Sequence, residues 1–250
     1  MSRASLIQVF LFFFLGLGNS LFAAETSPVK RGAWLQTSGT MPVVAALAVA
    51  GGLTLFDEDL RLSMQRHRSS SGDDVAGLLD FYAHPVSLAL LSGLLWGEGE
   101  LSGVETRSQT GRMGVEAVVL AEALTFGIKV AAGRERPANG GNAGQFQPLT
   151  LNDRHDSLPS AHTSGAFALA SVLRRRTQSL SLAIVAYGLA GGVGLSRIYR
   201  DDHWASDVLF GGIIGELAGR YVVSHGEARH LFWGILPYGG EWRAFLSWEW

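Results

Sequence analysis

The stretch SRIYRDDHWASD, residues 196–207, stands directly before an apolar run from Val208 to Val223 that predicts a helix. Either member of its Asp-Asp pair can cap the N-terminus of that helix. His203 and Asp207 are then one helical turn apart, on one face and within side-chain reach. A carboxylate placed there would keep one imidazole nitrogen protonated, so that the other nitrogen presents its lone pair to a substrate. The spacing alone fits an ordinary surface pair better.

A second polar cluster, PSAH at residues 159–162, opens another helix-like run, Ala161 to Leu173. Ser160 is a natural N-cap, and the free backbone N–H groups behind it form an anion site that suits a phosphate. His162, in the first turn, would lie near the same phosphate and could protonate a leaving alkoxide. Taken alone, this stretch is more typical of a capped helix with a partly exposed histidine.

Three cations complete the pattern. Lys129 and Arg136 stand in the spacing K-x6-R-P, and Arg197 belongs to the first stretch. Guanidinium groups bind phosphoryl oxygens bidentately, lysine acts as a point charge, and together such groups can take the place of a metal. Singly, Lys129 could reach out from the end of an apolar helix, and Arg136 with Pro137 could be a basic helix stop. Jointly, the three clusters predict phosphoryl transfer through a histidine nucleophile, with no metal and no cofactor.

With these residues in this order, the segment from about Gly114 to Gly219 resembles the type 2 phosphatidic acid phosphatase superfamily. That superfamily includes lipid phosphatases, bacterial non-specific acid phosphatases and vanadate-dependent haloperoxidases. The resemblance implies that His203 forms a phosphohistidine, that Asp207 orients it and that His162 is the general acid. The phosphate-binding residues that it implies are Lys129, Arg136, Ser160 and Arg197.

One position departs from the family pattern. The family usually has glycine where this chain has Ala161. Glycine allows the backbone to approach an anion closely. Alanine fits the first turn of a helix and adds only a methyl group, so we expect a slight change in the shape of the pocket.

The composition indicates a membrane setting. Of the 250 residues, 47% are hydrophobic and 17% are charged, and the mean hydropathy is +0.19. The chain is therefore more apolar than an ordinary soluble domain. The net charge of −2 gives no case for nucleic acid as a partner, since that would need a clustered basic face. The absence of cysteine excludes disulfides and thiolate metal sites.

The predicted fold is an all-α bundle of about six core helices, embedded in a membrane. Residues 1–24 read as a signal peptide or an N-terminal membrane anchor, and residues 25–40 as a polar linker. Residues 41–225 form the phosphatase helical domain, with its core motifs between 129 and 207, and residues 226–250 read as a β-hairpin. The hairpin tryptophans could lie at the membrane interface or simply cover the end of the bundle. The helical runs are Met41–Phe56, Val86–Trp96, Val115–Ala132, Ala161–Leu173, Leu180–Ile198 and Val208–Val223.

The topology is ambiguous from the sequence. Several runs are shorter than the roughly 20 residues that span a bilayer. Arginines at 107, 112 and 174–176 favour a cytoplasmic side for their loops, which places all three clusters on the outer face. If the signal is cleaved and all six runs span the bilayer, the arginine-rich loops lie outside and the site lies on the cytoplasmic face. The arrangement that the arginines favour is then lost. It is restored if the N-terminal stretch stays as the first span with Met41–Phe56 outside the bilayer, or if the mature protein is a soluble periplasmic bundle. Either alternative puts the site in the periplasm of a bacterial envelope.

These patterns predict a metal-independent phosphatase that hydrolyses phosphate monoesters or diphosphates of lipids at the periplasmic face of the inner membrane. By resemblance, the candidate substrates are phosphatidate, phosphatidylglycerophosphate, undecaprenyl diphosphate and the phosphates of lipid A. The alternatives are a soluble periplasmic acid phosphatase, a vanadate-dependent haloperoxidase and a non-catalytic membrane bundle. The segment from Phe56 to Asp80 mixes both charges, so we expect it to be solvated and assign it no site.

Overall fold

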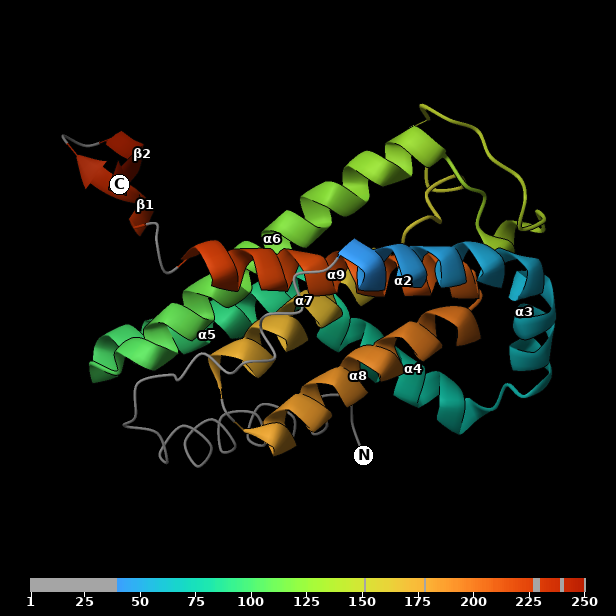
Figure 1. The fold of residues 1–250 in the computed structure, drawn as a ribbon, viewed down its shortest axis with the longest axis horizontal. Coiled ribbons are helices and arrows are strands. Elements are labelled where there is room, and N and C mark those ends of the chain that lie inside the picture. Colours follow the sequence, from blue (N-terminus) through green and yellow to red (C-terminus); the bar gives the residue numbers. More distant parts are fainter. Residues whose placement is uncertain (1–39, 151, 178, 227–229, 239–240, 250) are drawn as a thin grey trace.

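The structure, a computed structural model, describes residues 40–150, 152–177, 179–226, 230–238 and 241–249. Each predicted apolar run lies largely or wholly within an observed helix, which confirms the all-α bundle (Figure 1). The predicted signal peptide or anchor lies outside the described residues. The helices are α2 (Thr40–Leu53), α3 (Asp57–Arg66), α4 (Ser70–Ala83), α5 (Pro85–Ser102), α6 (Glu105–Ala132), α7 (Ala161–Arg176), α8 (Leu180–Tyr199) and α9 (Ala205–Gly226), with short 3-10 turns at Thr54–Phe56 and Pro137–Asn139.

Helix α7 is the centre of the bundle and packs against α6, α8 and α9. Its side chains are small, and Ala166, Ala168 and Val172 are fully buried. Glycines let α9 approach α7 at backbone distance: a Cβ on Gly215 would lie 2.1 Å from the carbonyl oxygen of Ser164. A larger residue at 215 would therefore force the two helices apart.

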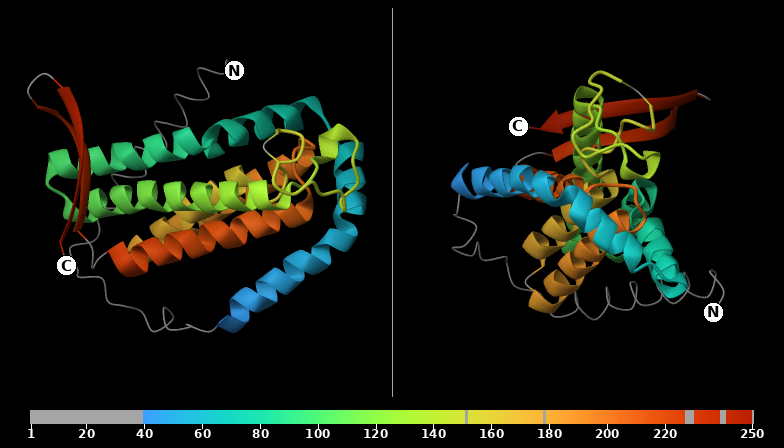
Figure 2. Two further views of the ribbon diagram at one scale, coloured as in Figure 1. Left: turned by 90° about the horizontal axis from the view of Figure 1, so that it is seen from above. Right: turned by 90° about the vertical axis from the view of Figure 1, so that its right-hand side faces the viewer.

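The ends of the helices bring the three sequence clusters together. Helices α6 and α8 end where α7 and α9 begin, and hydrogen bonds join these ends, for example from the Ser160 N–H to the Asp207 carbonyl at 3.1 Å. Figure 2 shows α3 and the loop between α6 and α7 at this same end of the bundle.

Most of the segment from Phe56 to Asp80 is exposed, as expected, but the prediction was wrong for the start of α3. Asp57, at the start of α3, is fully buried. Arg61, one turn later, forms a bidentate pair with Asp201, with both distances 2.6 Å. The amphipathic α3 therefore packs across the end of the bundle, and the partners of Asp57 and Arg61 lie between 77 and 149 positions away in the chain.

The opposite end of the bundle carries the arginines on which the predicted topology depends, at positions 107, 112 and 174–176. The Arg176 side chain donates to Gln109 Oε1 at 2.7 Å, which confirms that the α7–α8 turn and the start of α6 lie together. Arg107 and Arg112 belong to the first turns of α6 itself rather than to a loop. The arginine-rich end and the clustered motifs are thus at opposite ends of the helices.

Beyond α9 the chain forms β1 (His230–Tyr238) and β2 (Glu241–Glu249). The strands pair antiparallel, with His230 opposite Glu249 and Tyr238 opposite Glu241. The side chains of this segment are not described, so the role of its tryptophans stays a prediction.

Candidate active site

His203 lies in the turn between α8 and α9, and only 2% of its side chain is exposed. Its Nδ1 is 2.7 Å from the carbonyl oxygen of Ser157. A carbonyl can only accept, so Nδ1 carries the proton and Nε2 keeps its lone pair. Burial, and then the charges of Lys129, Arg136 and Arg197, lower the pKa of His203 well below its usual value. The imidazole is therefore neutral at pH 7, with its proton on Nδ1 and a lone pair on Nε2.

The structure modifies the predicted partnership of His203 with Asp207. The Asp207 Oδ2 is 3.9 Å from Nδ1, which is too long for a hydrogen bond. That oxygen instead accepts from the Ser157 hydroxyl at 2.6 Å and from the Trp204 N–H at 3.0 Å. Asp207 thus holds Ser157, and the backbone of Ser157 orients His203.

Neither Asp201 nor Asp202 caps α9, contrary to the sequence prediction. The helix begins at Ala205, beyond both residues, and Asp202 pairs instead with Arg197 at 2.9 Å. The side chain of Asp207 caps the helix instead, because its Oδ2 accepts a hydrogen bond from the Trp204 N–H, as the third residue of a capping box does.

Arg134 links this centre to α3, a connection that the sequence analysis missed. Its guanidinium donates to Asp207 Oδ1 at 2.5 Å and to Asp57 Oδ2 at 2.8 Å, and none of the three side chains is more than 1% exposed. Asp57 also accepts from the Ser206 N–H at 2.9 Å, so a residue of α3 caps the first turn of α9. The only feature of the sequence that could have indicated a role for Arg134 is its position two residues before Arg136. Nothing in the sequence singles out Asp57.

Lys129 and Arg136 share one carboxylate. Asp156 receives two bonds from Arg136, at 2.5 and 2.8 Å, and its Oδ2 is 3.8 Å from the Lys129 ammonium. Lys129 also donates to the Asp156 carbonyl. The two cations of the K-x6-R-P motif therefore converge on one point in the α6–α7 loop, as the prediction of a shared phosphate site requires.

Ser160 occupies the N-cap position of α7, as predicted, but its side chain makes no capping bond. The buried hydroxyl accepts instead from the Thr163 hydroxyl at 2.9 Å. The first N–H groups of α7 have no partner within the helix, which is the property that makes a helix N-terminus an anion site. Ala161 is the first residue of α7, so alanine occupies the helical first turn that was expected for it.

His162 and Arg197 meet at a carboxylate from α4. The His162 Nε2 is 3.5 Å from Asp80 Oδ1, and Arg197 donates to the same oxygen. The His84 ring packs edge-on against His162, with centroids 5.9 Å apart. The structure thus gathers every predicted site residue at one end of the bundle and adds Arg134, Asp57, Asp80 and Asp156, which the sequence analysis did not select.

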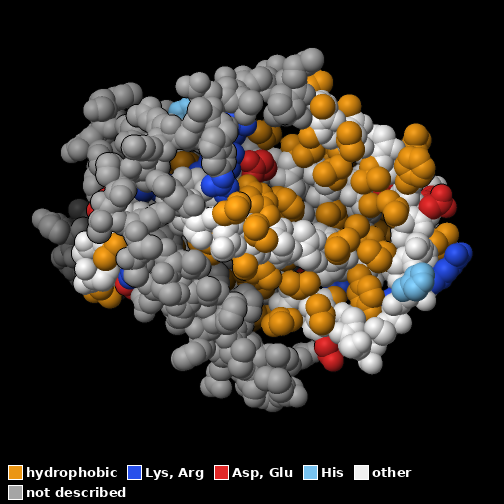
Figure 3. All heavy atoms as spheres, turned by 60° about the horizontal axis from the view of Figure 1, so that its bottom comes forward, with side chains coloured by type: hydrophobic (Ala, Val, Ile, Leu, Met, Phe, Trp, Pro, Cys, Tyr) orange, Lys and Arg blue, Asp and Glu red, His pale blue; other side chains and the backbone are white. Residues whose placement is uncertain are grey.

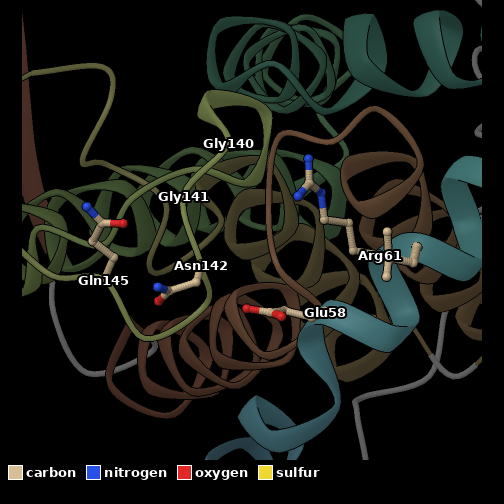
Figure 4. A pocket seen from close by; sticks show the side chains of 7 residues that line it. Glu58, Arg61, Gly140, Gly141, Asn142 and Gln145 are labelled. Carbon is tan, nitrogen blue, oxygen red and sulfur yellow. The ribbon is translucent and has the colours of Figure 1, made fainter.

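A cavity of about 330 Å³ lies beside this centre, between α3 and the loop that follows Arg136 (Figure 4). Its lining is mainly polar: Glu58, Arg61, Leu62, Gly140, Gly141, Asn142 and Gln145. Within the described part of the chain, no group of three or more His, Asp or Glu side chains is arranged to hold a metal ion.

Comparison with known families gives the same assignment as the motifs. Residues 114–230 match the family model described as the PAP2 superfamily. This segment belongs to that superfamily. The PAP2 segment starts within the first half of α6 and runs past α9, so it contains every predicted site residue, whereas Asp57 and Asp80 lie before it.

Among curated proteins, the lipid A 1-phosphatase of Porphyromonas gingivalis is 42% identical over 66 residues. The aligned part covers 26% of this chain and 15% of that phosphatase. Among solved structures, Aquifex aeolicus LpxE has a TM-score of 0.56 at 22% identity, covering 68% of this chain and 95% of the other, which shows a shared fold. A PAP2 type phosphatidylglycerolphosphate phosphatase from Bacillus subtilis has a TM-score of 0.31 at 22% identity, covering 89% of this chain and 96% of the other.

Proposed function

We propose that this protein is a phosphatase that hydrolyses phosphate esters of lipids through a phosphohistidine on His203. One observation carries the proposal: a buried, neutral imidazole has its Nδ1 proton fixed on the Ser157 carbonyl and lies in the field of Lys129, Arg136 and Arg197. A nucleophilic lone pair beside three cations suits attack on an anionic phosphoryl group.

The reaction follows from these positions. The Nε2 lone pair of His203 attacks phosphorus, and the bond from phosphorus to the leaving oxygen breaks in line. His162 donates its proton to that oxygen, so the alcohol departs neutral. Water then attacks the phosphohistidine, His162 takes back a proton, and inorganic phosphate is released. The three cations bind the equatorial oxygens, on which the transferring group spreads its charge.

The surface supports a lipid substrate. Figure 3 shows apolar side chains gathered over one face of the molecule. Large apolar side chains on α4 and α8 are between 45% and 66% exposed, namely Val75, Phe81, Leu180, Ile184, Val185 and Leu195. Exposed apolar patches mark surfaces that contact a membrane or another protein. By length and hydropathy, α8 could cross a membrane, and so could α4 with α5 as one span bent by 57°; the other described helices do not meet both criteria.

An acidic side chain within one of the apolar helices is paired, as a membrane setting favours. Glu216 of α9 accepts from Arg175 at 2.7 Å and from the Tyr187 hydroxyl at 2.6 Å. With the arginine-rich end in the cytoplasm, the site at the other end faces the periplasm. We therefore propose the inner membrane as the location, with the active site accessible from outside.

A phosphate-release panel tests the proposal. The detergent-purified full-length protein is assayed with phosphatidate, phosphatidylglycerophosphate, undecaprenyl diphosphate, a lipid A phosphate and p-nitrophenyl phosphate. The lipid A phosphate is included because 66 residues of this chain are 42% identical to the lipid A 1-phosphatase of Porphyromonas gingivalis. We expect release from at least one lipid, unchanged by EDTA, and none from the His203→Ala variant. Hydrolysis of p-nitrophenyl phosphate alone would point to a soluble-type acid phosphatase instead.

A further inference from the structure

Asp80 lies in the last turn of α4, outside the PAP2 segment, yet it contacts two residues of the proposed phosphate site. One of its oxygens accepts from Arg197 and is 3.5 Å from the His162 Nε2. About 32% of its side chain is exposed, so this carboxylate stands at the boundary between the buried centre and solvent. The packing of α4 itself does not depend on this carboxylate, because the helix packs through apolar side chains such as Leu79 and Tyr82.

The surroundings of His162 give this carboxylate a chemical task. A general acid must be protonated when the leaving group departs. Burial, and then the charge of Arg197, lower the pKa of His162 to about 4, with further lowering from His84 and Lys129, while Asp80 acts in the opposite direction. Among the charged groups that face His162, Asp80 is therefore the one that favours the imidazolium.

The same carboxylate competes with the substrate. Arg197 donates to Asp80 in this structure, and it also has to bind a phosphoryl oxygen during the reaction. Asp156 stands in the same relation to Arg136 and Lys129 at the other side of the site. A phosphoryl oxygen that binds the Nη1 of Arg197 would therefore displace the Asp80 carboxylate from it.

We propose that Asp80 is a positioning residue of the active site, which orients the His162 ring and favours its protonated form for proton donation, and which yields Arg197 to the bound phosphoryl group. The inference rests on the proposed function. It predicts two opposite effects of removing the charge. Phosphate binds more tightly because a competitor for Arg197 is lost, and turnover slows where the leaving oxygen needs a proton.

The experiment compares Asp80→Asn with the wild-type protein. Inhibition by vanadate, and direct binding of inorganic phosphate by calorimetry, should both strengthen by about three- to tenfold, since one charge-assisted bond no longer competes. The kcat on a lipid phosphate should fall by about 100-fold, as expected for loss of general-acid catalysis, and the kcat on p-nitrophenyl phosphate by less than about tenfold. Asp80→Glu should restore part of the lipid phosphatase activity.

Asp73→Asn is the matched control, because Asp73 lies on the same helix and pairs only with the exposed Arg68 among the described contacts. It should match the wild-type protein in every assay. Equal losses of kcat on both substrates in Asp80→Asn, with unchanged phosphate affinity, would leave Asp80 a merely structural role and overturn the inference. If the wild-type protein releases no phosphate from any substrate, the proposed function fails, whereas an active wild type with an unaffected Asp80→Asn refutes only this inference.

Discussion

Arg134 and Asp207 form an ion pair that is closed to solvent, with Nη1 2.5 Å from Oδ1 and neither side chain more than 1% exposed. Burying a charge is costly unless it is paired and hydrogen-bonded. Here the remaining polar atoms also have partners: Arg134 reaches Asp57 and the Ser206 hydroxyl, and Asp207 holds Ser157. The pair therefore fixes α3 and the start of α9 around the turn that carries His203.

Removal of one partner should destabilise the protein because the other charges stay buried without compensation. For Arg134→Ala we expect a loss of about 3–5 kcal/mol in the free energy of unfolding, in the range for a broken buried pair. Thermal unfolding of the detergent-purified protein measures it. Arg68→Ala, which breaks an exposed pair, is the control and should leave the melting temperature almost unchanged. Similar melting temperatures for both variants would show that the buried pair is not a stabilising element.

The roles of His203 and Asp207 are separable by mutation. His203→Ala should abolish turnover and any trapped phosphoenzyme. Asp207→Asn removes a buried charge that pairs with Arg134, and because Asp207 reaches His203 only through Ser157, its kcat should fall by less than the about 10⁴-fold expected for a triad carboxylate bonded directly to the imidazole. Ser157→Ala removes the hydroxyl that Asp207 holds but keeps the carbonyl that orients His203, so it should cost less than Asp207→Asn. Substantial activity in His203→Ala would refute the mechanism.

His162 should matter most where the leaving group is poor. A phenolate departs without much help, whereas an alkoxide needs a proton. His162→Ala should therefore reduce phosphoenzyme formation from p-nitrophenyl phosphate much less than from a lipid phosphate, as measured by rapid-quench kinetics. Equal losses on both substrates would mean that His162 only binds phosphate.

The pH dependence should differ between the free and the substrate-bound protein. In the free protein the pKa of His203 lies well below 6.5 and that of His162 is about 4. The nucleophile is then neutral down to acidic pH, while the general acid loses its proton already above about pH 4. A bound phosphate dianion favours the charged imidazolium and raises the pKa of His162. The optimum of kcat/KM should therefore lie at lower pH than that of kcat; identical optima would contradict this.

Topology can be measured with single cysteines, because the chain has none of its own. Ser102 lies at the arginine-rich end of the bundle and Asn142 at the end that carries the site, and both residues are exposed. In intact spheroplasts, a membrane-impermeant maleimide should label Asn142→Cys and spare Ser102→Cys, since short arginine-rich segments resist translocation. Labelling of both would indicate a soluble periplasmic protein, and labelling of Ser102→Cys alone would reverse the orientation.

The amino-acid sequence by itself predicted six of the eight described α-helices, all except α3 and α4, and the set of motif residues. Helical periodicity and apolar runs extend over neighbouring residues, so α7, α8 and α9 could be predicted close to their observed limits. The motif residues could be selected because their chemistry repeats at short spacings, as with His203 and Asp207. Even there, the local prediction named the wrong immediate partner: a backbone carbonyl, which every residue carries, orients His203.

Only the tertiary structure decided which carboxylates meet these cations. Asp57 pairs with Arg134, which lies 77 positions later in the chain, and Asp80 pairs with Arg197, which lies 117 positions later. Their segment has the mixed charge of an ordinary solvated surface, and no local spacing distinguishes either residue. Their roles arise because α3 packs across the end of the bundle and α4 packs against α8, where burial makes each charge depend on an opposite charge from a distant part of the chain.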